Sequence, residues 1–315
     1  MQIKRVLRAV MAGVLFLHLT ACGENDTSRL QPPSVQLAVV DRRPVKLEDG
    51  KVYSYNTDGS WEQIGPDGEA IQIVDGEYLC TLDTDGKLYY DWVPTDEEPL
   101  PLTSGYTQYM AWLALEINET EHFACVNQEP IRLYFRALLQ SGEILFQSGD
   151  EYTHLQLEEL PVSLSGAYIL TDAGNIWFMR DEDVSELKCV YSGGDIIEID
   201  ANNNAGRCLA LTRDHHVVSL QFHGSALEVS DWNHIISIEQ EFNYAVGLTD
   251  KGEVLYAAAG HANESIKNTE ESVMEALSEW SDVIQIAANG ADIIGLKQDG
   301  SCYILDLDDY TQSEP

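Results

Sequence analysis

The sequence predicts an all-β repeat protein, and two observations support that prediction. The first is a hairpin pattern that occurs seven times, each copy with an apolar strand, a tight polar turn and a second strand rich in β-branched and aromatic residues. The second is the spacing, because units that recur every few dozen residues indicate a solenoid or a propeller. The copies cover residues 45–53, 80–89, 137–145, 168–177, 209–218, 246–256 and 294–303.

Turn chemistry explains why each copy should form a hairpin. A two-residue hairpin turn needs positive φ angles, which Asp-Gly adopts at little cost. The fifth copy has His216 where the other six have glycine. The expected turn positions are residues 50, 86, 142, 174, 216, 252 and 300, and the gaps between them leave room for about four short strands per unit.

A further strand precedes several of the hairpins. It has the form Ile-x-Ile, whose alternation should place one face inward. The copies are 71–73, 197–199, 236–238 and 284–286. Small residues precede three hairpin leucines, and we expect Ala210, Gly247 and Gly295 where units crowd together near a central axis.

Residues 283–303 and 235–256 resemble the regulator of chromosome condensation repeat. The shared pattern is an isoleucine strand followed by Gly/Ala-Leu, a polar Gly turn and a strand ending in Tyr. The resemblance implies a seven-bladed β-propeller of four-stranded antiparallel blades over about residues 34–308. The family's segment after the hairpin, Trp-Gly and then Gly-Gln-Leu-Gly, is missing from every copy, and 259–264 comes nearest to it.

The N-terminus predicts export and a lipid anchor. Residues 1–21 have a basic start and a short apolar run, which is typical of a secretory signal. Their end, with Cys22 after Leu-Thr-Ala, resembles the bacterial lipobox, although an ordinary signal with a chance cysteine is the alternative. Gly23 rather than Asp follows, which favours the outer over the inner membrane of the envelope. We expect a flexible tether at 22–33, the propeller at 34–308 and an acidic tail at 309–315.

The charge is strongly negative. The sequence has 53 acidic and 18 basic residues, a net charge of −35, and loss of the three basic residues of the signal makes it −38. Such a chain repels nucleic acid and anionic lipid, so we expect membrane contact only through the lipid. The acids are either a solvated surface or a docking face for a basic partner protein. We expect a monomer.

Cysteine and motif chemistry point to no active site. Five cysteines follow Cys22, an odd number, so at least one thiol is free, and the disulfide state stays open. Two of them, Cys80 and Cys208, lie on hairpin strands and should be buried. The full set is Cys80, Cys125, Cys189, Cys208 and Cys302.

Candidate ligand sets are better explained as turns or surface. Asp83 to Gly86 lacks the first and last ligands of a calcium loop. The pair His215-His216 should face solvent in a turn, and the acids at 181–183 lie in a loop. We therefore expect no catalytic residues, no metal and no cofactor.

Two insertions could carry binding, since loops on a rigid scaffold often do. The first, 91–132, contains Tyr106, Tyr109, Trp112 and His122. The second, 260–280, predicts a short helix near 270–280. One helix face has Val273, Ala276, Leu277 and Trp280, and the other has Glu271, Glu275 and Glu279. The helix either packs on a blade edge or faces a partner.

Ring closure and function complete the expectations. The strand at 35–40 should lie beside the last repeat, near 302–307, because a propeller normally joins its ends.

The favoured function is a membrane-anchored scaffold for protein interactions in the envelope. The alternatives are an accessory lipoprotein of outer-membrane protein assembly, and an enzyme acting on glycans or peptides in a central funnel. The enzyme is disfavoured because the strand starts expected at the axis carry Ile, Ala and Gly.

Overall fold

The computed structural model describes the repeat region and leaves out the N-terminus. Residues 1–34 lie outside the described residues, and with them the predicted signal, most of the tether and Cys22. No helix among the described residues is long and apolar enough to cross a membrane. The described ranges are 35–40, 42–65, 69–74, 79–91, 106–109, 112–115, 123–126, 136–148, 151–179, 187–201, 206–221, 227–260 and 264–311.

The described strands form seven antiparallel sheets, here numbered in chain order. Sheet 1 contains β1 (Val35–Val40), β2 (Arg43–Glu48), β3 (Lys51–Tyr55) and β4 (Trp61–Ile64). Sheet 2 has the order β5-β6-β7-β9-β8, with β5 (Ala70–Val74), β6 (Cys80–Asp83), β7 (Leu88–Asp91), β8 (Tyr106–Tyr109) and β9 (Trp112–Leu115). Sheet 3 contains β10 (Phe123–Val126), β11 (Arg136–Leu139), β12 (Ile144–Ser148) and β13 (Glu151–Leu155).

The remaining four sheets follow in the same way. Sheet 4 contains β14 (Pro161–Ser165), β15 (Tyr168–Thr171), β16 (Ile176–Phe178) and β17 (Lys188–Tyr191). Sheet 5 contains β18 (Ile196–Asp200), β19 (Arg207–Thr212) and β20 (Val217–Gln221). Sheet 6 contains β21 (Ile235–Gln240), β22 (Tyr244–Thr249) and β23 (Val254–Ala258). Sheet 7 contains β24 (Val283–Asn289), β25 (Asp292–Lys297) and β26 (Cys302–Asp306).

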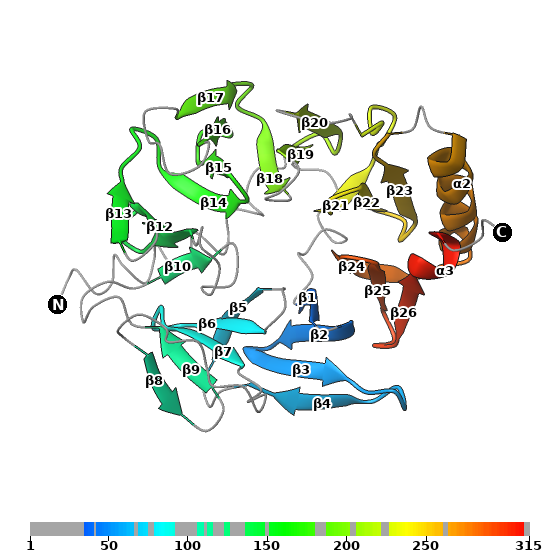
Figure 1. Ribbon diagram of the computed structural model, residues 1–315, viewed down its shortest axis with the longest axis horizontal. Helices are drawn as coiled ribbons and strands as arrows, with labels where there is room; N and C mark the ends of the chain where they lie inside the picture. The colour runs from blue at the N-terminus through cyan, green and yellow to red at the C-terminus, as the bar shows by residue number, and fades with distance from the viewer. Residues whose placement is uncertain are drawn as a thin grey trace, which may run out of the picture. The chain divides into compact units, whose positions relative to one another are not determined.

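Each sheet contacts the next one along the chain, and sheet 7 contacts sheet 1. The contacts run from β1 to β5, β6 to β10, β11 to β14, β14 to β18, β18 to β21, β21 to β24 and β24 back to β1. Figure 1 shows that the first strand of each sheet lies nearest the common centre of the sheets. The all-β prediction is therefore confirmed, and the chain of contacts closes on itself.

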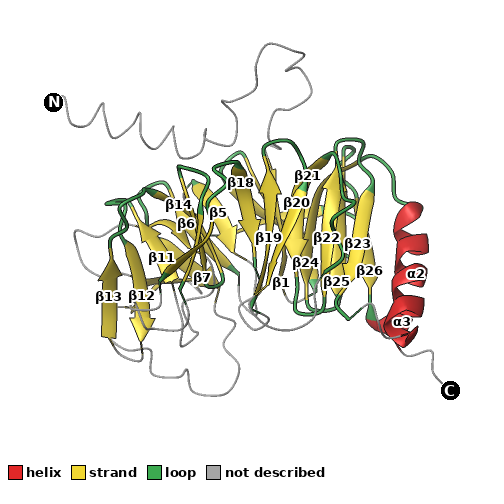
Figure 2. Ribbon diagram, turned by 90° about the horizontal axis from the view of Figure 1, so that it is seen from above, coloured by secondary structure: helices red, strands yellow, loops and turns green. Residues whose placement is uncertain are grey.

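Strand number departs from the expectation of four per unit. Within the described residues, sheets 5, 6 and 7 have three strands, and sheet 2 has five because the insertion at 91–132 adds β8 and β9. In sheet 6 the helix α2 (Glu264–Ser278) packs against β23 where a fourth strand would pair, beside α3 (Asp308–Thr311) (Figure 2). The Glu270 carboxylate accepts a hydrogen bond from the Ala258 N–H of β23. The helix thus covers the outer edge of β23 and supplies a hydrogen-bond acceptor for one of its N–H groups.

Only the first hairpin has the two-residue turn that we expected throughout. Asp49 and Gly50 both have positive φ, 51° and 75°. The other six turns are longer and have one left-handed residue, whose N–H bonds to the carbonyl three residues earlier. In the fifth turn that residue is His215, with φ 65°, and not His216. A longer turn needs one positive φ instead of two, so a histidine at that single position is tolerated.

The apolar core lies between the sheets. Leu211, Leu248 and Leu296 occupy equivalent buried positions, each opposite the first residue of the following strand. Gly247 and Gly295, next to two of these leucines, are small for a different reason from the crowding near a central axis that we expected. A Cβ on Gly247 would lie 2.8 Å from the Trp232 ring, and one on Gly295 would lie 2.7 Å from the Trp280 ring. These glycines make room for the tryptophan that leads into their own sheet.

Sheets 1 and 7 meet, but they share no strand. Strand β1 pairs along its whole length with β2, and packs against β24 and β25 instead of pairing with sheet 7. Trp61 Nε1 donates to the Gly300 carbonyl at 2.7 Å, and Asn289 Nδ2 donates to the Val39 carbonyl at 3.0 Å. The Arg42 guanidinium pairs with Asp292 and Asp306. Sheets 7 and 1 are therefore joined by packing and by side-chain bonds, because β1 pairs with β2 and not with a strand of sheet 7.

Part of the predicted acidic tail is structured. Helix α3 begins at Asp308, and Tyr310 packs partly against the apolar core between sheets 6 and 7. The last four residues, 312–315, lie outside the described residues.

Candidate functional site: the inner rim

A bulge at the same place recurs in six first strands. The pairing of each with its second strand shifts by one residue, in β5, β10, β14, β18, β21 and β24. A β-bulge inserts an extra residue and re-aims the side chains beside it. The residue after the bulge is polar in every copy whose side chain is described. We call these five the inner rim: Gln72, Ser163, Glu198, Ser237 and Gln285.

The first strands therefore carry polar residues as well as the Ile, Ala and Gly that we expected at the strand starts. The acid of the inner rim, Glu198, lies on β18 and is half-buried. Two residues further along, Asp200 lies on the same strand and is also half-buried. The isoleucine pattern was visible in the sequence, but the polar residue inside it looked like plain alternation. The bulge changes the direction of the side chain at that position, and no sequence motif marks a bulge.

Asp200 joins three successive sheets. Its carboxylate accepts hydrogen bonds from the Gln240 N–H of sheet 6 at 2.5 Å, from the Ser165 hydroxyl of sheet 4 at 3.1 Å and from its own neighbour, the Ala201 N–H. Burial raises the pKa of Asp200, and these donors oppose the increase because they stabilise the charged form. The carboxylate therefore fixes the relative positions of β14, β18 and β21.

Glu198 has fewer partners than Asp200. Its Oε1 accepts one long hydrogen bond, 3.4 Å from the Ile238 N–H of β21. Burial, with a smaller contribution from the nearby charge of Asp200, raises the pKa of Glu198 to about 8. The raised pKa favours the protonated form of this carboxyl group, which can donate as well as accept a hydrogen bond.

Side chains cover the open edges of other first strands in a similar way. Gln36 of β1 accepts from the Ile73 N–H at 3.0 Å and donates to the Ile71 carbonyl at 3.2 Å. An edge strand presents unpaired N–H and C=O groups, and these amide contacts satisfy them across the seam between two sheets.

A second set of bonds links successive sheets at the start of three second strands, β11, β15 and β19. Arg136 donates to the Gly166 carbonyl, Tyr168 to Gly206, and Arg207 to Phe242, each in the inner turn of the following sheet. The guanidinium of Arg207 is buried, and its Nε and Nη1 have no hydrogen-bond partner. Desolvation lowers the pKa of Arg207. The seams are thus bonded at one structural position by residues of different type.

The sequence candidates for chemistry stay apart from the inner rim. Asp83 caps its own turn by accepting from the Asp85 and Lys87 N–H groups, which confirms the turn interpretation. His215 Nδ1 lies 2.8 Å from the Ile235 carbonyl, so this histidine ties its turn to sheet 6. Among the described residues no group of three or more His, Cys, Asp or Glu could hold a metal ion. The acids at 181–183 lie outside the described residues.

The four cysteines whose side chains are described form no disulfide with one another. Cys80 and Cys208 are buried, as we expected from their place on hairpin strands, and Cys189 is exposed. Burial raises the pKa of Cys302 to about 12. Cys125 lies on β10, and its side chain is outside the described residues. None of these thiols lies on a described part of the inner rim.

Helix α2 runs from Glu264 to Ser278, so it begins before the predicted 270–280 and ends before Glu279 and Trp280, but its amphipathic pattern is as predicted. Val273 and Leu277 are buried, and Glu271, Met274 and Glu275 are exposed. The helix therefore packs on a sheet edge and still presents an acidic outer face with one large apolar side chain.

Comparisons with known proteins identify the fold. No protein-family model matches the chain, and no curated protein matches it by sequence. It is similar to the CRINKLY WD40 ectodomain of the Arabidopsis thaliana receptor kinase ACR4, with 11% identity over 87% of this chain and 94% of that chain and a TM-score of 0.57. It is also similar to human WBSCR16, with 11% identity, 85% and 88% coverage and a TM-score of 0.55.

A third similar structure is the computationally designed protein Ika8. Its identity is 11%, the coverage is 86% of this chain and 95% of that chain, and the TM-score is 0.51. WD40 repeats form the blades of β-propellers. The chain thus has a propeller-type fold of repeated antiparallel sheets.

Proposed function

We propose that the seven sheets are the blades of a seven-bladed propeller of the regulator of chromosome condensation type, and that it acts as a protein-interaction scaffold anchored in a bacterial envelope. The observation that carries this proposal is the set of bonded seams between successive sheets. Asp200 alone ties three first strands together. A body braced in this way holds its surface turns and loops in fixed positions, and such loops are where binding residues concentrate.

Lipid on Cys22 would supply the anchor. The signal-like segment before it ends in Leu-Thr-Ala, and each buried lipid methylene contributes about 0.8 kcal/mol to membrane binding. Several acyl chains together hold a soluble domain on a membrane. The scaffold needs no catalytic residue and no cofactor, and its partner would be a protein.

Helix α2 is the first surface to test for partner binding. Its outer face combines Glu271 and Glu275 with Met274, which is 47% exposed. The chain carries a net charge of −35, so a basic partner surface would be complementary. Long-range attraction of this kind weakens as salt screens it.

A pull-down from solubilised envelope tests the scaffold. The bait is the full chain, and the comparison baits are the double variant Glu271→Lys/Glu275→Lys and a control with Asp85→Lys and Asp172→Lys on distant exposed turns. We expect a partner that is retained by the wild type and the control and lost with the α2 variant and at high salt. Equal recovery by all three baits would exclude α2, and assembly factors of outer-membrane proteins as the main partners would favour that alternative function.

Cell fractionation with radiolabelled palmitate tests the anchor. The wild type should be labelled and membrane-bound, and Cys22→Ser should be unlabelled and either soluble or left as a precursor. Cys189→Ser is the matched control, because Cys189 is an exposed thiol outside the signal. Soluble, processed protein from both the wild type and Cys22→Ser would refute lipidation.

A further inference from the structure

The outer edge of sheet 7 has no pairing strand among the described residues. Its last strand, β26, pairs with β25 on its inner side only. Figure 1 shows β26 farther from the common centre than β24 and β25. Sheets 1, 3 and 4 have a fourth strand at the equivalent place, and in sheet 6 helix α2 packs there. Sheet 7 therefore ends on a strand whose outer side could accept another.

The backbone of Ile304 points to this open side. Hydrogen-bonded pairs alternate along an antiparallel ladder, and the bond from the Leu307 N–H to the Ala291 carbonyl fixes the alternation here. Tyr303 and Leu305 therefore bond to β25, whereas the N–H and C=O of Ile304 point away from it. The residue is also 50% exposed. Ile304 thus presents a donor, an acceptor and an apolar side chain at one place.

The edge of β26 lacks the charged side chains that protect other outer strands. An exposed edge strand tends to pair with another chain unless charge, proline or a bulge prevents it. The outer strands of the four-stranded sheets carry Glu62, Glu151 and Lys188. On β26 the only charged residue is Asp306, at the end of the strand, and Arg42 pairs with it. The centre of β26 is therefore suited to strand pairing.

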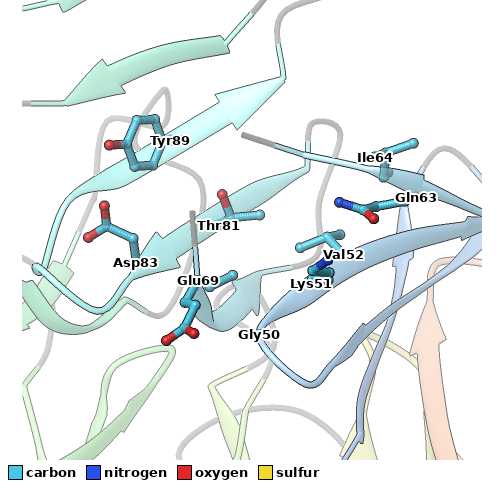
Figure 3. A pocket seen from close by; sticks show the side chains of 10 residues that line it. Gly50, Lys51, Val52, Gln63, Ile64, Glu69, Thr81, Asp83 and Tyr89 are labelled. Atoms are coloured by element: carbon cyan, nitrogen blue, oxygen red, sulfur yellow. The ribbon is translucent and has the colours of Figure 1, made fainter. Parts of the chain in front are cut away.

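Aromatic side chains of sheet 1 lie beside this edge. Cys302, on the same face of β26 as Ile304, packs with Trp61 in the core between sheets 7 and 1, and its N–H lies 3.5 Å from the Tyr55 hydroxyl. The Tyr55 and Trp61 rings are 4.8 Å apart and partly exposed. Val52 is on the opposite face of sheet 1, where it lines a pocket shared with sheet 2 (Figure 3). An added strand could thus pack an apolar side chain between Ile304 and these rings.

Charge indicates which kind of strand would bind. Asp308 and Asp309 follow β26 directly and are exposed, and Asp299, which pairs with Lys297, precedes it. The whole chain has a net charge of −35. A basic segment is complementary to such a surface. A second copy of this chain would bring the same acids to the edge and would be repelled.

We propose that the outer edge of sheet 7 binds an extended, basic segment of a partner protein, which adds antiparallel to β26 as a fourth strand. Main-chain bonds to Ile304 supply affinity, and alternate side chains of the segment supply specificity. An apolar residue lies opposite Ile304, and basic residues on either side of it point to the other face. This inference rests on the proposed scaffold role, but neither on helix α2 nor on the lipid anchor.

A short fluorescent peptide in which lysine and valine alternate tests the proposal. Fluorescence anisotropy with the full chain should show binding, because the valines can lie beside Ile304 with their N–H groups toward β26. An analogue N-methylated on its valines should bind about tenfold more weakly or not at all, whereas one N-methylated on its lysines, with the same charge, should bind as the parent does. Equal binding of all three peptides would show charge attraction alone and would overturn the proposal.

Variants of Ile304 test the site on the protein. Ile304→Pro removes the outward N–H and takes no bond from the β25 pairing, so it should abolish peptide binding. Ile304→Lys should do the same by repelling the basic peptide, and Ile304→Val is the control that keeps binding. Circular dichroism checks that each variant is folded. Unchanged binding by a folded Ile304→Pro and by Ile304→Lys would place the peptide elsewhere.

Amide hydrogen exchange distinguishes the occupants of the edge. In the free chain the Ile304 amide should exchange fast, and the peptide should slow it without changing Leu305, which already bonds to β25. A slow Ile304 amide in the free chain would mean that the edge is already covered, and protection that rises with protein concentration would indicate a second copy. Either result would overturn the proposal, and neither would affect the pull-down that tests α2 and the scaffold.

Discussion

Replacing the carboxyl of Glu198 should make the protein less sensitive to pH. Burial raises its pKa from the ordinary value of 4.5 to about 8 in the folded state. Below pH 4.5 both the folded and the unfolded chain carry the proton, so this site costs no stability there. As the pH rises from 4.5 to about 8, the unfolded chain releases the proton and the folded chain keeps it, so stability falls. Above about pH 8 the loss is complete.

The structure sets the size of the effect. At about 1.36 kcal/mol for each pH unit, a pKa raised from 4.5 to about 8 corresponds to a loss of up to about 5 kcal/mol. The half-buried side chain retains some contact with solvent, so the measured loss should be smaller. Glu198→Gln keeps the oxygen that accepts from the Ile238 N–H and removes the proton equilibrium.

Urea unfolding of Glu198→Gln and the wild type at a series of pH values measures this difference. The two should have similar free energies of unfolding near pH 4.5, and the variant should become the more stable one as the pH approaches 8. Glu253→Gln on an exposed turn is the control and should parallel the wild type. A difference that stays constant across this pH range would show that Glu198 titrates as an ordinary carboxyl, and our account of the inner rim would be wrong.

Three other predictions concern the repeat and its closure. Leu248→Ala should lower the free energy of unfolding by about 2–5 kcal/mol, measured by circular dichroism in urea, because Leu248 is fully buried; an unchanged midpoint would contradict its place in the core. Gly247→Ala should cost about 1–3 kcal/mol, since its new methyl group would meet the Trp232 ring, and a crystal structure should show that ring displaced. Deleting 35–40 should abolish the cooperative transition because β1 pairs with β2 and packs on β24, whereas deleting 312–315 should leave the transition unchanged.

The repeated hairpins could be predicted because their rules are local. A strand, a turn residue of suitable φ and a second strand lie within about ten residues of one another, and both alternation and turn chemistry act over that span. The same reasoning predicted the buried face of α2 from Val273 and Leu277. The turn type could not be predicted in this way. His215 and not His216 has the left-handed φ, and the His215 N–H bonds to the Thr212 carbonyl.

The inner rim could not be predicted from the pattern. Ile-Ile-Glu-Ile in β18 looks like an alternating strand, and only the pairing shift between Ile196 and Glu198 shows that the strand contains a bulge. The bonds between sheets could not be predicted either. Arg136 and Tyr168 occupy the same structural position and each donates to a carbonyl of the following sheet, but they are different residue types, so no motif connects them.

The sequence by itself determined the repeat, the β class of the chain and its acidic composition, because each of these depends on neighbouring residues or on residue counts. Tertiary structure alone decided which strand packs against the last sheet, why Gly247 must be small and why the pKa of Glu198 is raised. Trp61 and Gly300 are 239 residues apart and meet only because sheet 7 packs on sheet 1. Residues so far apart in the sequence become buried against each other and form hydrogen bonds only when the faces of the sheets pack together.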